Sequence, residues 1–371
     1  MGERITFVGL DVHKATIAVC LAEAGRDGEV RFVGEIANEP AALDKLVARL
    51  GRGGRELRFA YEAGPCGYGV YRHLRDRGAE CVVVAPSMIP RRPGDRIKTD
   101  RRDATALARP HRAGELTPVW VPDPGHEAMR DLVRARADMA EALRKARQRL
   151  NGFLLRHGRN YDAKRRTWRH REWLADQAFP HPAQQIAAQE YLDAVGELEA
   201  RVERITGRIR ALAPAWSMAP VVEALQAMRG LSLVAASALV AEVGDMRRSD
   251  SPRQLMAYLG LVPSERSSGA KRRQGAITKA GSPLARRMLV EGAWTYRLPA
   301  RVSAHMKPRL EGLPREVRET AWKAQVRLCA RYRRLLAAGK RPQVVATAIA
   351  REMLGFARAI GRMVAPRTAA A

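Results

Sequence analysis

The hydrophobic pattern of the chain changes character once, a little beyond residue 113. Up to that point, short apolar runs of strand length alternate with segments of helical periodicity. From residue 124 onward the strand signals vanish and helical ones dominate. A chain patterned in this way is expected to fold as an α/β domain followed by an all-α part.

The first part has the signals of five strands and three helices. Gly25, Asp27 and Gly28 supply a turn between the second and third strands, and Pro86 stops the last one. The order is that of a mixed sheet of the ribonuclease-H type, although the pattern alone does not fix the topology. The predicted strands are 5–10, 16–22, 30–36, 57–61 and 80–85, and the predicted helices are 41–50, 67–77 and 99–113.

The stretch 124–219 has the pattern of two long helices. We predict that 156–182, interrupted by Gly158, Pro180 and Pro182, is a loop or flap between them. Apolar residues near the end of the stretch alternate spacings of three and four, as in a coiled coil or a long helical hairpin, and a helix packed on its own domain fits equally well. These residues are Val195, Leu198, Val202, Ile205, Ile209 and Leu212.

The remainder, 220–371, is predicted to be helical. A Gly-containing turn at 228–231, followed by Ala235, Ala236 and Leu239, is typical of a helix-hairpin-helix element. Such an element exposes backbone N–H groups to a phosphate at a helix N-terminus. A plain helical hairpin has the same pattern, so both interpretations stay open.

The net charge of the chain limits the kinds of binding partner to expect. The chain has 66 Lys and Arg against 39 Asp and Glu, a net charge of +27. We expect a polyanionic partner, with nucleic acid ahead of a membrane surface. Residues 134–171 alone hold thirteen Lys or Arg and three Asp or Glu, so this helical segment is expected to follow a phosphate backbone. The interleaved Tyr161, Trp168 and Trp173 are candidates either for stacking on bases or for packing in a core or an interface.

Targeting and redox signals are absent from the sequence. No apolar run is long enough to span a membrane, and the start lacks a basic segment followed by an apolar one, so we expect neither a span nor a secretory signal. The scattered cysteines, without C-x-x-C pairs, argue against a zinc site and a disulfide scaffold and fit a reducing cytoplasm. They are Cys20, Cys66, Cys81 and Cys329.

Four carboxylates stand at strand ends and at a helix start in the α/β part. Asp11 and Glu62 follow predicted strands, and Asp100 and Asp103, three apart, face one side of a predicted helix. In a mixed sheet these positions can converge, and four carboxylates together need cations to offset their repulsion. Mg²⁺ suits them, because it takes oxygen ligands and keeps waters for a substrate phosphate. The set therefore indicates metal-assisted phosphoryl transfer.

Several sequence blocks carry a family resemblance. GLDVHK at 9–14, YEAGPCGYGVYRHL at 61–74, IKTDRRDATALA at 97–108 and the long stretch 228–294 resemble the DEDD transposases of bacterial insertion sequences, the group numbered one hundred and ten. The blocks occur in the family's order and span nearly the whole chain. The resemblance implies a RuvC-like catalytic domain over 1–123, a coiled-coil connector over 124–219 and a helical C-terminal transposase domain over 220–371.

The resemblance also implies a serine that attacks DNA. The family's Ser-Gly pair matches Ser268 and Gly269, and the adjacent Ser267 stays open as the nucleophile. Two departures are visible, Ala270 where a second glycine is common and Ala63 where a threonine often follows the glutamate. Basic residues near the serine and near the carboxylates are expected to hold nucleic-acid phosphates. They are Lys271, Arg272 and Arg273, and Lys98, Arg101 and Arg102.

The implied partners are donor DNA, target DNA and a bridge RNA, a structured guide encoded by the element itself. The broad positive charge fits such a load, because a protein that leaves sequence reading to base pairing needs mainly backbone contacts. The family further implies homodimers and homotetramers in which the carboxylates of one protomer complete the serine site of another. The apolar seam over 195–212 is a candidate assembly surface, and we expect a bacterial cytoplasmic protein associated with the nucleoid.

Two other functions remain open at this stage. The first is a metal-only nuclease of the Holliday-junction-resolving kind, in which Asp11, Glu62, Asp100 and Asp103 activate water. The second is a nucleic-acid-binding protein without catalysis. Ser268→Ala separates the first from a serine recombinase, and Asp11→Ala separates the second from both enzymes.

Overall fold

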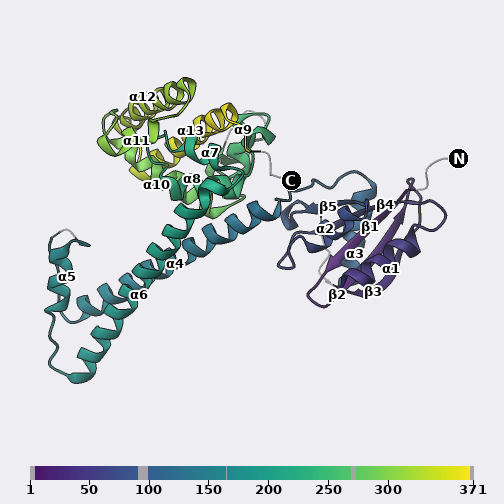
Figure 1. Ribbon diagram of the computed structural model, residues 1–371, viewed down its shortest axis with the longest axis horizontal. Helices are drawn as coiled ribbons and strands as arrows, with labels where there is room; N and C mark the ends of the chain where they lie inside the picture. The colour runs from purple at the N-terminus through teal and green to yellow at the C-terminus, as the bar shows by residue number, and fades with distance from the viewer. Residues whose placement is uncertain (1–4, 91–98, 164, 269–272, 368–371) are drawn as a thin grey trace. The chain divides into compact units, whose positions relative to one another are not determined.

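The computed structural model describes residues 5–90, 99–163, 165–268 and 273–367 (Figure 1). The chain divides between Val121 and Pro122 into two compact units. The first holds the strands and helices of a mixed α/β fold, and the second is mostly helical. The switch in hydrophobic pattern therefore marks a real change of fold class.

A five-stranded mixed sheet forms the centre of the first unit, in the order β3-β2-β1-β4-β5. The first three strands form an antiparallel meander, while β4 and β5 run parallel to β1. All five predicted strands are present, with small shifts at their ends. They are β1 (Ile5–Val12), β2 (Thr16–Glu23), β3 (Val30–Ala37), β4 (Glu56–Glu62) and β5 (Glu80–Val84).

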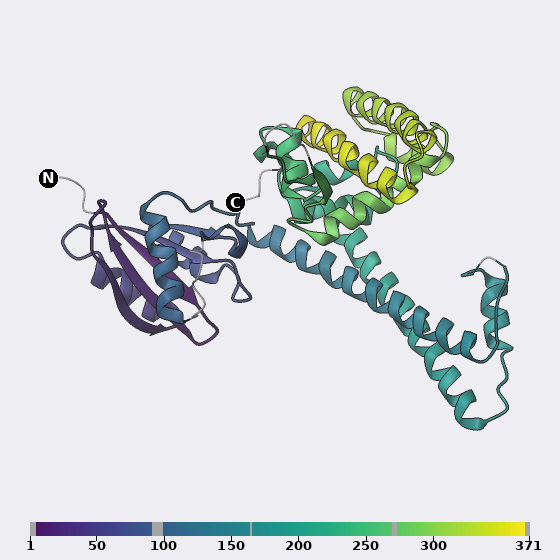
Figure 2. The ribbon, with the colours of Figure 1, turned by 180° about the vertical axis from the view of Figure 1, so that it is seen from behind.

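Helices cover both faces of this sheet (Figures 1 and 2). On one face α1 (Pro40–Leu50) and α2 (Gly69–Asp76) bury Leu43, Leu46 and Leu74 against the larger apolar side chains of β1, β2 and β4. On the other face α3 (Asp100–Arg112) packs through alanines against small residues of β2. The two sides of the sheet thus differ in the size of their side chains, and α3 lies on the side with the small ones.

A long antiparallel hairpin of α4 (Pro124–Arg156) and α6 (Pro182–Leu212) opens the second unit. The segment 156–182, predicted as a loop or flap, also contains a short helix, α5 (Trp168–Ala175), which Figure 1 shows at the far end of the hairpin. The side chain of Thr167 caps it by accepting the N–H of His170 at 3.2 Å. This side-chain cap stabilises a helix that is too short for its periodicity to be recognised in the sequence.

The predicted apolar seam of α6 is used within the chain. Ile209 is fully buried and Ile205 packs against the same core, while Val195 packs against the cluster at the other end of the hairpin. Leu212, the last member, is exposed. Of the forms that the spacing allows, the described chain has a helical hairpin whose α6 also packs on the core of its own domain through Ile205 and Ile209. Val195, Leu198 and Val202 are only half-buried, so part of the seam stays accessible in the single chain.

The rest of the second unit is a helical body around α8, whose buried residues include Leu239 and Val240. A two-stranded antiparallel sheet of β6 (Pro263–Glu265) and β7 (Gln274–Ile277) interrupts the segment that we predicted to be wholly helical. The helices are α7 (Ala219–Leu225), α8 (Leu233–Val243), α9 (Pro252–Tyr258), α10 (Pro283–Ala293), α11 (Lys307–Leu310), α12 (Arg315–Ala337) and α13 (Pro342–Met363).

The Gly-containing turn at 228–231 joins α7 to α8. A Cβ on Gly230 would lie 2.5 Å from the carbonyl oxygen of Gly292 in α10, and Met228 and Leu231 are fully buried. Two helices joined by a Gly-containing turn are therefore present, as predicted. The close packing of this turn on α10 is enough to require glycine at position 230. Phosphate binding at the start of α8 stays a prediction.

The cysteines and the apolar helices bear on the expected absence of disulfides and of a membrane span. All four cysteines are free thiols, three of them buried. Among the described residues, no helix is both long enough and apolar enough to cross a membrane.

Candidate metal centre and serine loop

The position of α3 on the sheet depends on Gly9. A Cβ built on this residue would lie 2.3 Å from the carbonyl oxygen of Ala104 and 2.5 Å from the backbone nitrogen of Ala108, both in α3. Only glycine permits so close an approach of strand and helix. Because Gly9 lies against the middle of α3, the residues two positions further along β1 lie beside its first turn.

The strand register brings two acidic residues to that place. Gly9 pairs with Cys20 and Asp11 with Ala18 in β2, and both partners face α3. Side chains alternate along a strand, so Asp11 also faces α3. In the parallel neighbour β4, Tyr61 pairs with Leu10 and faces the opposite helices, which turns Glu62 toward the α3 side beside Asp11. Asp11 and Glu62 therefore share one face and one end of the sheet.

The first turn of α3 supplies the other two carboxylates. Thr99 caps the helix, its hydroxyl accepting the N–H of Arg102 at 3.3 Å. Asp100 and Asp103 follow in the first turn, where negative charge is favoured by the helix dipole. Asp100 is half exposed and Asp103 is partly buried. All four predicted acidic residues thus belong to one end of the sheet and the helix start that covers it.

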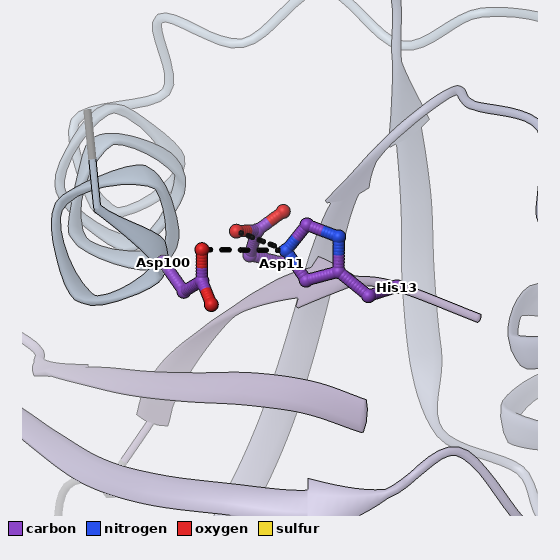
Figure 3. Close-up of side chains that lie close together, drawn as sticks. All are labelled: Asp11, His13 and Asp100. Atoms are coloured by element: carbon purple, nitrogen blue, oxygen red, sulfur yellow. Dashed lines mark ion pairs between the residues drawn. The ribbon is translucent and has the colours of Figure 1, made fainter. Parts of the chain in front are cut away.

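Three side chains form the tightest part of this group (Figure 3). Nε2 of His13 lies 3.2 Å from Oδ2 of Asp11 and 3.5 Å from Oδ1 of Asp100. One ligand atom from each of the three lies within 4.8 Å of the others, a spacing that could hold a metal ion. Among the described residues, Glu62 and Asp103 are not part of this closest set.

The electrostatics of Asp11 are unfavourable without a further cation. Burial raises the pKa of its carboxyl group; the charges of Asp103 and Asp100 act in the same direction, and His13 opposes them. Oδ2 of Asp11 is buried, and its 3.2 Å contact with Nε2 of His13 is an ion pair that lacks the alignment of a hydrogen bond. A buried carboxylate oxygen normally accepts a well-aligned hydrogen bond, so this oxygen still has acceptor capacity to offer a ligand.

Of the three basic residues predicted near the carboxylates, two lie within the described part of the chain. Arg101 and Arg102 are exposed on the first turn of α3, and the guanidinium of Arg101 lies over the ring of Phe32, 5.8 Å from its centroid. Lys98 lies outside the described residues. The two arginines thus lie at the rim of the acidic group.

The second candidate site lies on the β6–β7 hairpin. Ser267 and Ser268 follow β6 and are exposed. The hydroxyl of Ser267 donates to Oε1 of Glu265 at 2.9 Å, and Nε2 of Gln274 donates to the other oxygen, Oε2, at 3.3 Å. Arg273 is exposed at the start of the returning segment. Gly269, Ala270, Lys271 and Arg272 lie outside the described residues.

Two residues at these sites were missed or left without a role by sequence reasoning. His13 lies two positions after Asp11 in the DVHK block, where it could order the site, but a single histidine in a sequence is more often a packing residue. Glu265 was not selected, because its relation to Ser267 depends on a strand that we had predicted as helix. Its signal in the sequence is only a carboxylate two positions before a serine.

Comparisons with known proteins agree with this organisation. Residues 8–158 match a family model for DEDD transposases, described as "Transposase", and residues 222–307 match one described as "Transposase IS116/IS110/IS902 family". The chain is 53% identical over 360 residues to "Putative transposase y4qE" of Sinorhizobium fredii, covering 97% of this chain and 89% of that protein.

A second relative is more distant but covers a similar span. The chain is 31% identical over 338 residues to the transposase for insertion sequence element IS1533 of Leptospira borgpetersenii, covering 90% of this chain and 97% of that protein. The first family match contains Asp11, Glu62, Asp100 and Asp103, and the second contains Ser267 and Ser268.

Proposed function

The chain belongs to the IS110 family of DEDD transposases, which cut and rejoin DNA, and on this premise we propose that Ser268 attacks a DNA phosphate with the help of Mg²⁺, guided by an RNA that the element encodes. The observation that carries the proposal is the gathering of the partly buried Asp11 carboxylate with Asp100 and His13, whose ligand atoms lie within 4.8 Å of one another. The serine and the guide rest on the family resemblance.

The acidic residues fit a magnesium ion. Asp11 offers a buried carboxylate oxygen, and Asp100, Asp103 and Glu62 add carboxylates on the same side of the sheet. Hard oxygen ligands of this kind are those that Mg²⁺ prefers. When bound, the ion supplies positive charge to the phosphate oxygens during phosphoryl transfer. His13 would orient Asp11 and Asp100 by bridging them.

The serine reaction is a displacement at phosphorus. The Oγ–P bond forms while the P–O bond to the leaving deoxyribose oxygen breaks, and the hydroxyl proton passes to a general base. The phosphoserine link conserves the energy of the broken DNA bond, so a second strand can be joined by the reverse attack. Arg273, together with Lys271 and Arg272, would hold the phosphate by charge-assisted hydrogen bonds.

Ser267 is the alternative nucleophile, and one contact favours it. Its hydroxyl already donates to Glu265, and a carboxylate in that position can accept the proton as the oxygen attacks. Ser268 has the family's Ser-Gly match in its favour. Variants of the two residues separate them.

Guide RNA, target DNA and assembly complete the proposal. The net charge of +27 suits a protein that binds several nucleic-acid strands through their backbones. We propose a homodimer or homotetramer in which the acidic group of one protomer serves the serine of another.

A metal-only nuclease is the second candidate, favoured by the acidic group itself. Asp11, Asp100 and His13 gather within one unit without any contribution from a serine. In this function a water attacks the phosphate and no covalent protein–DNA link forms.

A strand-exchange assay separates the candidates. Purified protein, the RNA encoded beside its gene, matched donor and target DNA and Mg²⁺ are combined, and exchanged strands are resolved on a denaturing gel. We expect Ser268→Ala and Asp11→Ala each to abolish exchange. Exchange that survives Ser268→Ala but not Ser267→Ala would move the nucleophile to Ser267. Cleavage that survives both serine variants identifies the metal-only nuclease, and DNA binding unchanged in every variant without any cleavage identifies a non-catalytic binding protein.

A further inference from the structure

The end of the α4–α6 hairpin contains a hollow that the proposed chemistry does not use. It measures about 150 Å³ and lies between the C-terminal part of α4, the segment that follows and α5. We call it the tip hollow. Its lining is Asn151, Gly152, Leu154, Leu155, Arg159, Asn160, Tyr161, Arg165, His170 and Trp173.

The hollow is built on a packed base. Phe153, Leu154 and Leu150 of α4 form a small core with Phe179 and Ala188, and Trp173 of α5 packs against it. This core fixes α5 against the hairpin, so the hollow is preformed and does not need a ligand to order its walls.

One wall of the tip hollow is aromatic. The rings of His170 and Trp173 are stacked, with centroids 5.9 Å apart and planes 16° from parallel. Tyr161 leans on both, 4.8 Å from His170 and 5.2 Å from Trp173. Burial lowers the pKa of His170, with the charge of Arg165 acting in the same direction, so the imidazole is neutral at pH 7. The wall therefore presents uncharged flat rings.

The rest of the lining offers polar groups and space. The amide of Asn151 and the guanidinium of Arg165 have no hydrogen-bond or ion-pair partner among the described residues. Gly152 lies within a long helix, where alanine would be more stable. A Cβ there would meet nothing within 4 Å, so no contact inside the protein requires this glycine. Beside the aromatic rings, the lining therefore offers the Asn151 amide as donor and acceptor, the Arg165 cation, and space next to Gly152.

We propose that the tip hollow receives one unpaired nucleotide of a nucleic-acid strand, with its base against Tyr161 and Trp173 and its phosphate bound by Arg165. Stacking on aromatic rings with a nearby cation is how unpaired bases are held in general. Asn151 can pair with a base edge. The inference rests on the proposed function only in requiring a nucleic acid as partner.

The surrounding charge points to a strand rather than a free nucleotide. Residues 134–171, which run along α4 to α5, carry ten more positive than negative charges. Such a length of positive charge matches a polyanion, whereas a single nucleotide needs only the cation at the hollow.

The test compares two duplexes of equal length, one fully paired and one with a single unpaired 2-aminopurine. Each is prepared as RNA and as DNA, and binding is measured by fluorescence anisotropy. We expect the wild type to bind the bulged duplex about tenfold more tightly, with a change in 2-aminopurine fluorescence on stacking. Preference for the RNA form assigns the nucleotide to a guide RNA, and preference for the DNA form assigns it to DNA.

Gly152→Leu is the variant that keeps the fold. Leucine is a better helix former than glycine, and its side chain would occupy the hollow. We expect the bulge preference to disappear while affinity for the paired duplex is unchanged. Gly196→Leu is the matched control, because Gly196 is an exposed glycine within α6 with nothing within 4 Å of its Cβ position.

Two results would overturn the proposal: equal binding of bulged and paired duplexes by the wild type, or the same loss in Gly196→Leu as in Gly152→Leu. Arg165→Ala is expected to weaken the bulged complex selectively, and an equal loss for both duplexes would also contradict the hollow as its site. The assay involves no cleavage, so failure of the serine chemistry leaves its outcome untouched.

Discussion

At Asp11 a carboxylate is held where burial and two neighbouring acids all disfavour its charge. Glu242, at the end of α8, shows how the same chain treats a buried carboxylate that only stabilises the fold. Arg134 donates to both of its oxygens, at 2.7 and 3.0 Å. Burial alone would raise the pKa of Glu242, but the hydrogen bonds and charge of Arg134 outweigh it and lower the pKa. The contrast indicates that Asp11 is kept for binding rather than for stability.

Asp11→Asn tests this distinction. The amide removes a disfavoured charge, so we expect the melting temperature of the α/β unit to rise by about 3 °C while Mg²⁺ binding and DNA cleavage are lost. Calorimetric melting and metal titration measure the two effects, with Asp27→Asn as the control because Asp27 is exposed in a turn. An Asp11→Asn variant that unfolds, or that still binds Mg²⁺ normally, contradicts the assignment.

Glu242→Gln is expected to lower the melting temperature, whereas Asp11→Asn is expected to raise it. Loss of the charged hydrogen bonds from Arg134 is expected to cost about 2 kcal/mol, a fall of about 5 °C in melting temperature. Because the folded pKa lies below the unfolded one, this stabilisation is present above the unfolded pKa of about 4.3 and disappears as the pH falls through the folded value. Melting curves from pH 7 to pH 3 should therefore converge with the wild type.

Glu223→Gln is the control for that series, since Glu223 is an exposed glutamate of α7 in the same unit. It should melt like the wild type at every pH. A gap between Glu242→Gln and the wild type that stays constant down to pH 3 would show that the charge of Glu242 is not the cause.

Single residues were predictable from the sequence where a pattern placed them. Asp11, Glu62, Asp100 and Asp103 stood at strand ends and in a helix's first turn, and the structure gathers them at one end of the sheet. Their roles as ligands stay a prediction. The bridging position of His13 and the contact between Ser267 and Glu265 depend on side-chain directions, which residue spacing does not contain.

The packing of α3 on β1 connects element geometry to the site. Gly9→Ala would drive a methyl group into the backbone of α3 near Ala104 and Ala108. We expect α3 to shift, the α/β unit to lose about 3 kcal/mol of stability, and the acidic group to open, with loss of Mg²⁺ binding. Thermal melting and metal titration measure this.

The same substitution at Gly69 is the control, because a Cβ at the start of α2 meets nothing within 4 Å. Gly69→Ala should keep both stability and metal binding. If Gly9→Ala retains full metal affinity, the close approach of α3 is not what assembles the carboxylates.

Elements were predictable where periodicity was long or strands were continuous. The five strands of the sheet and the helices of the hairpin follow from such patterns. The strands β6 and β7 were missed because they have only three and four residues and form by pairing with each other, and α5 was missed because it depends on a side-chain cap. The apolar seam of α6 was identified, but periodicity does not tell whether the covering helix comes from the same chain.

For the molecule as a whole, charge predicts how binding responds to salt. With a net charge of +27 we expect affinity for nucleic acid to fall about a thousandfold or more between 50 and 200 mM salt, as counterions return to the phosphates. Filter binding over a salt series measures the slope. A nearly flat response would indicate a binding surface that is apolar rather than cationic.

The proposed reaction joins two sites that lie in different units of the chain, an acidic metal centre and a serine loop. Its most direct test is to stop the reaction with donor DNA and Mg²⁺, digest the protein and locate any attached nucleotide by mass spectrometry. We predict a phosphodeoxynucleotide on Ser268, absent in Asp11→Asn. Cleaved DNA with no modified peptide would contradict the serine mechanism, and a nucleotide on Ser267 would contradict the choice of Ser268.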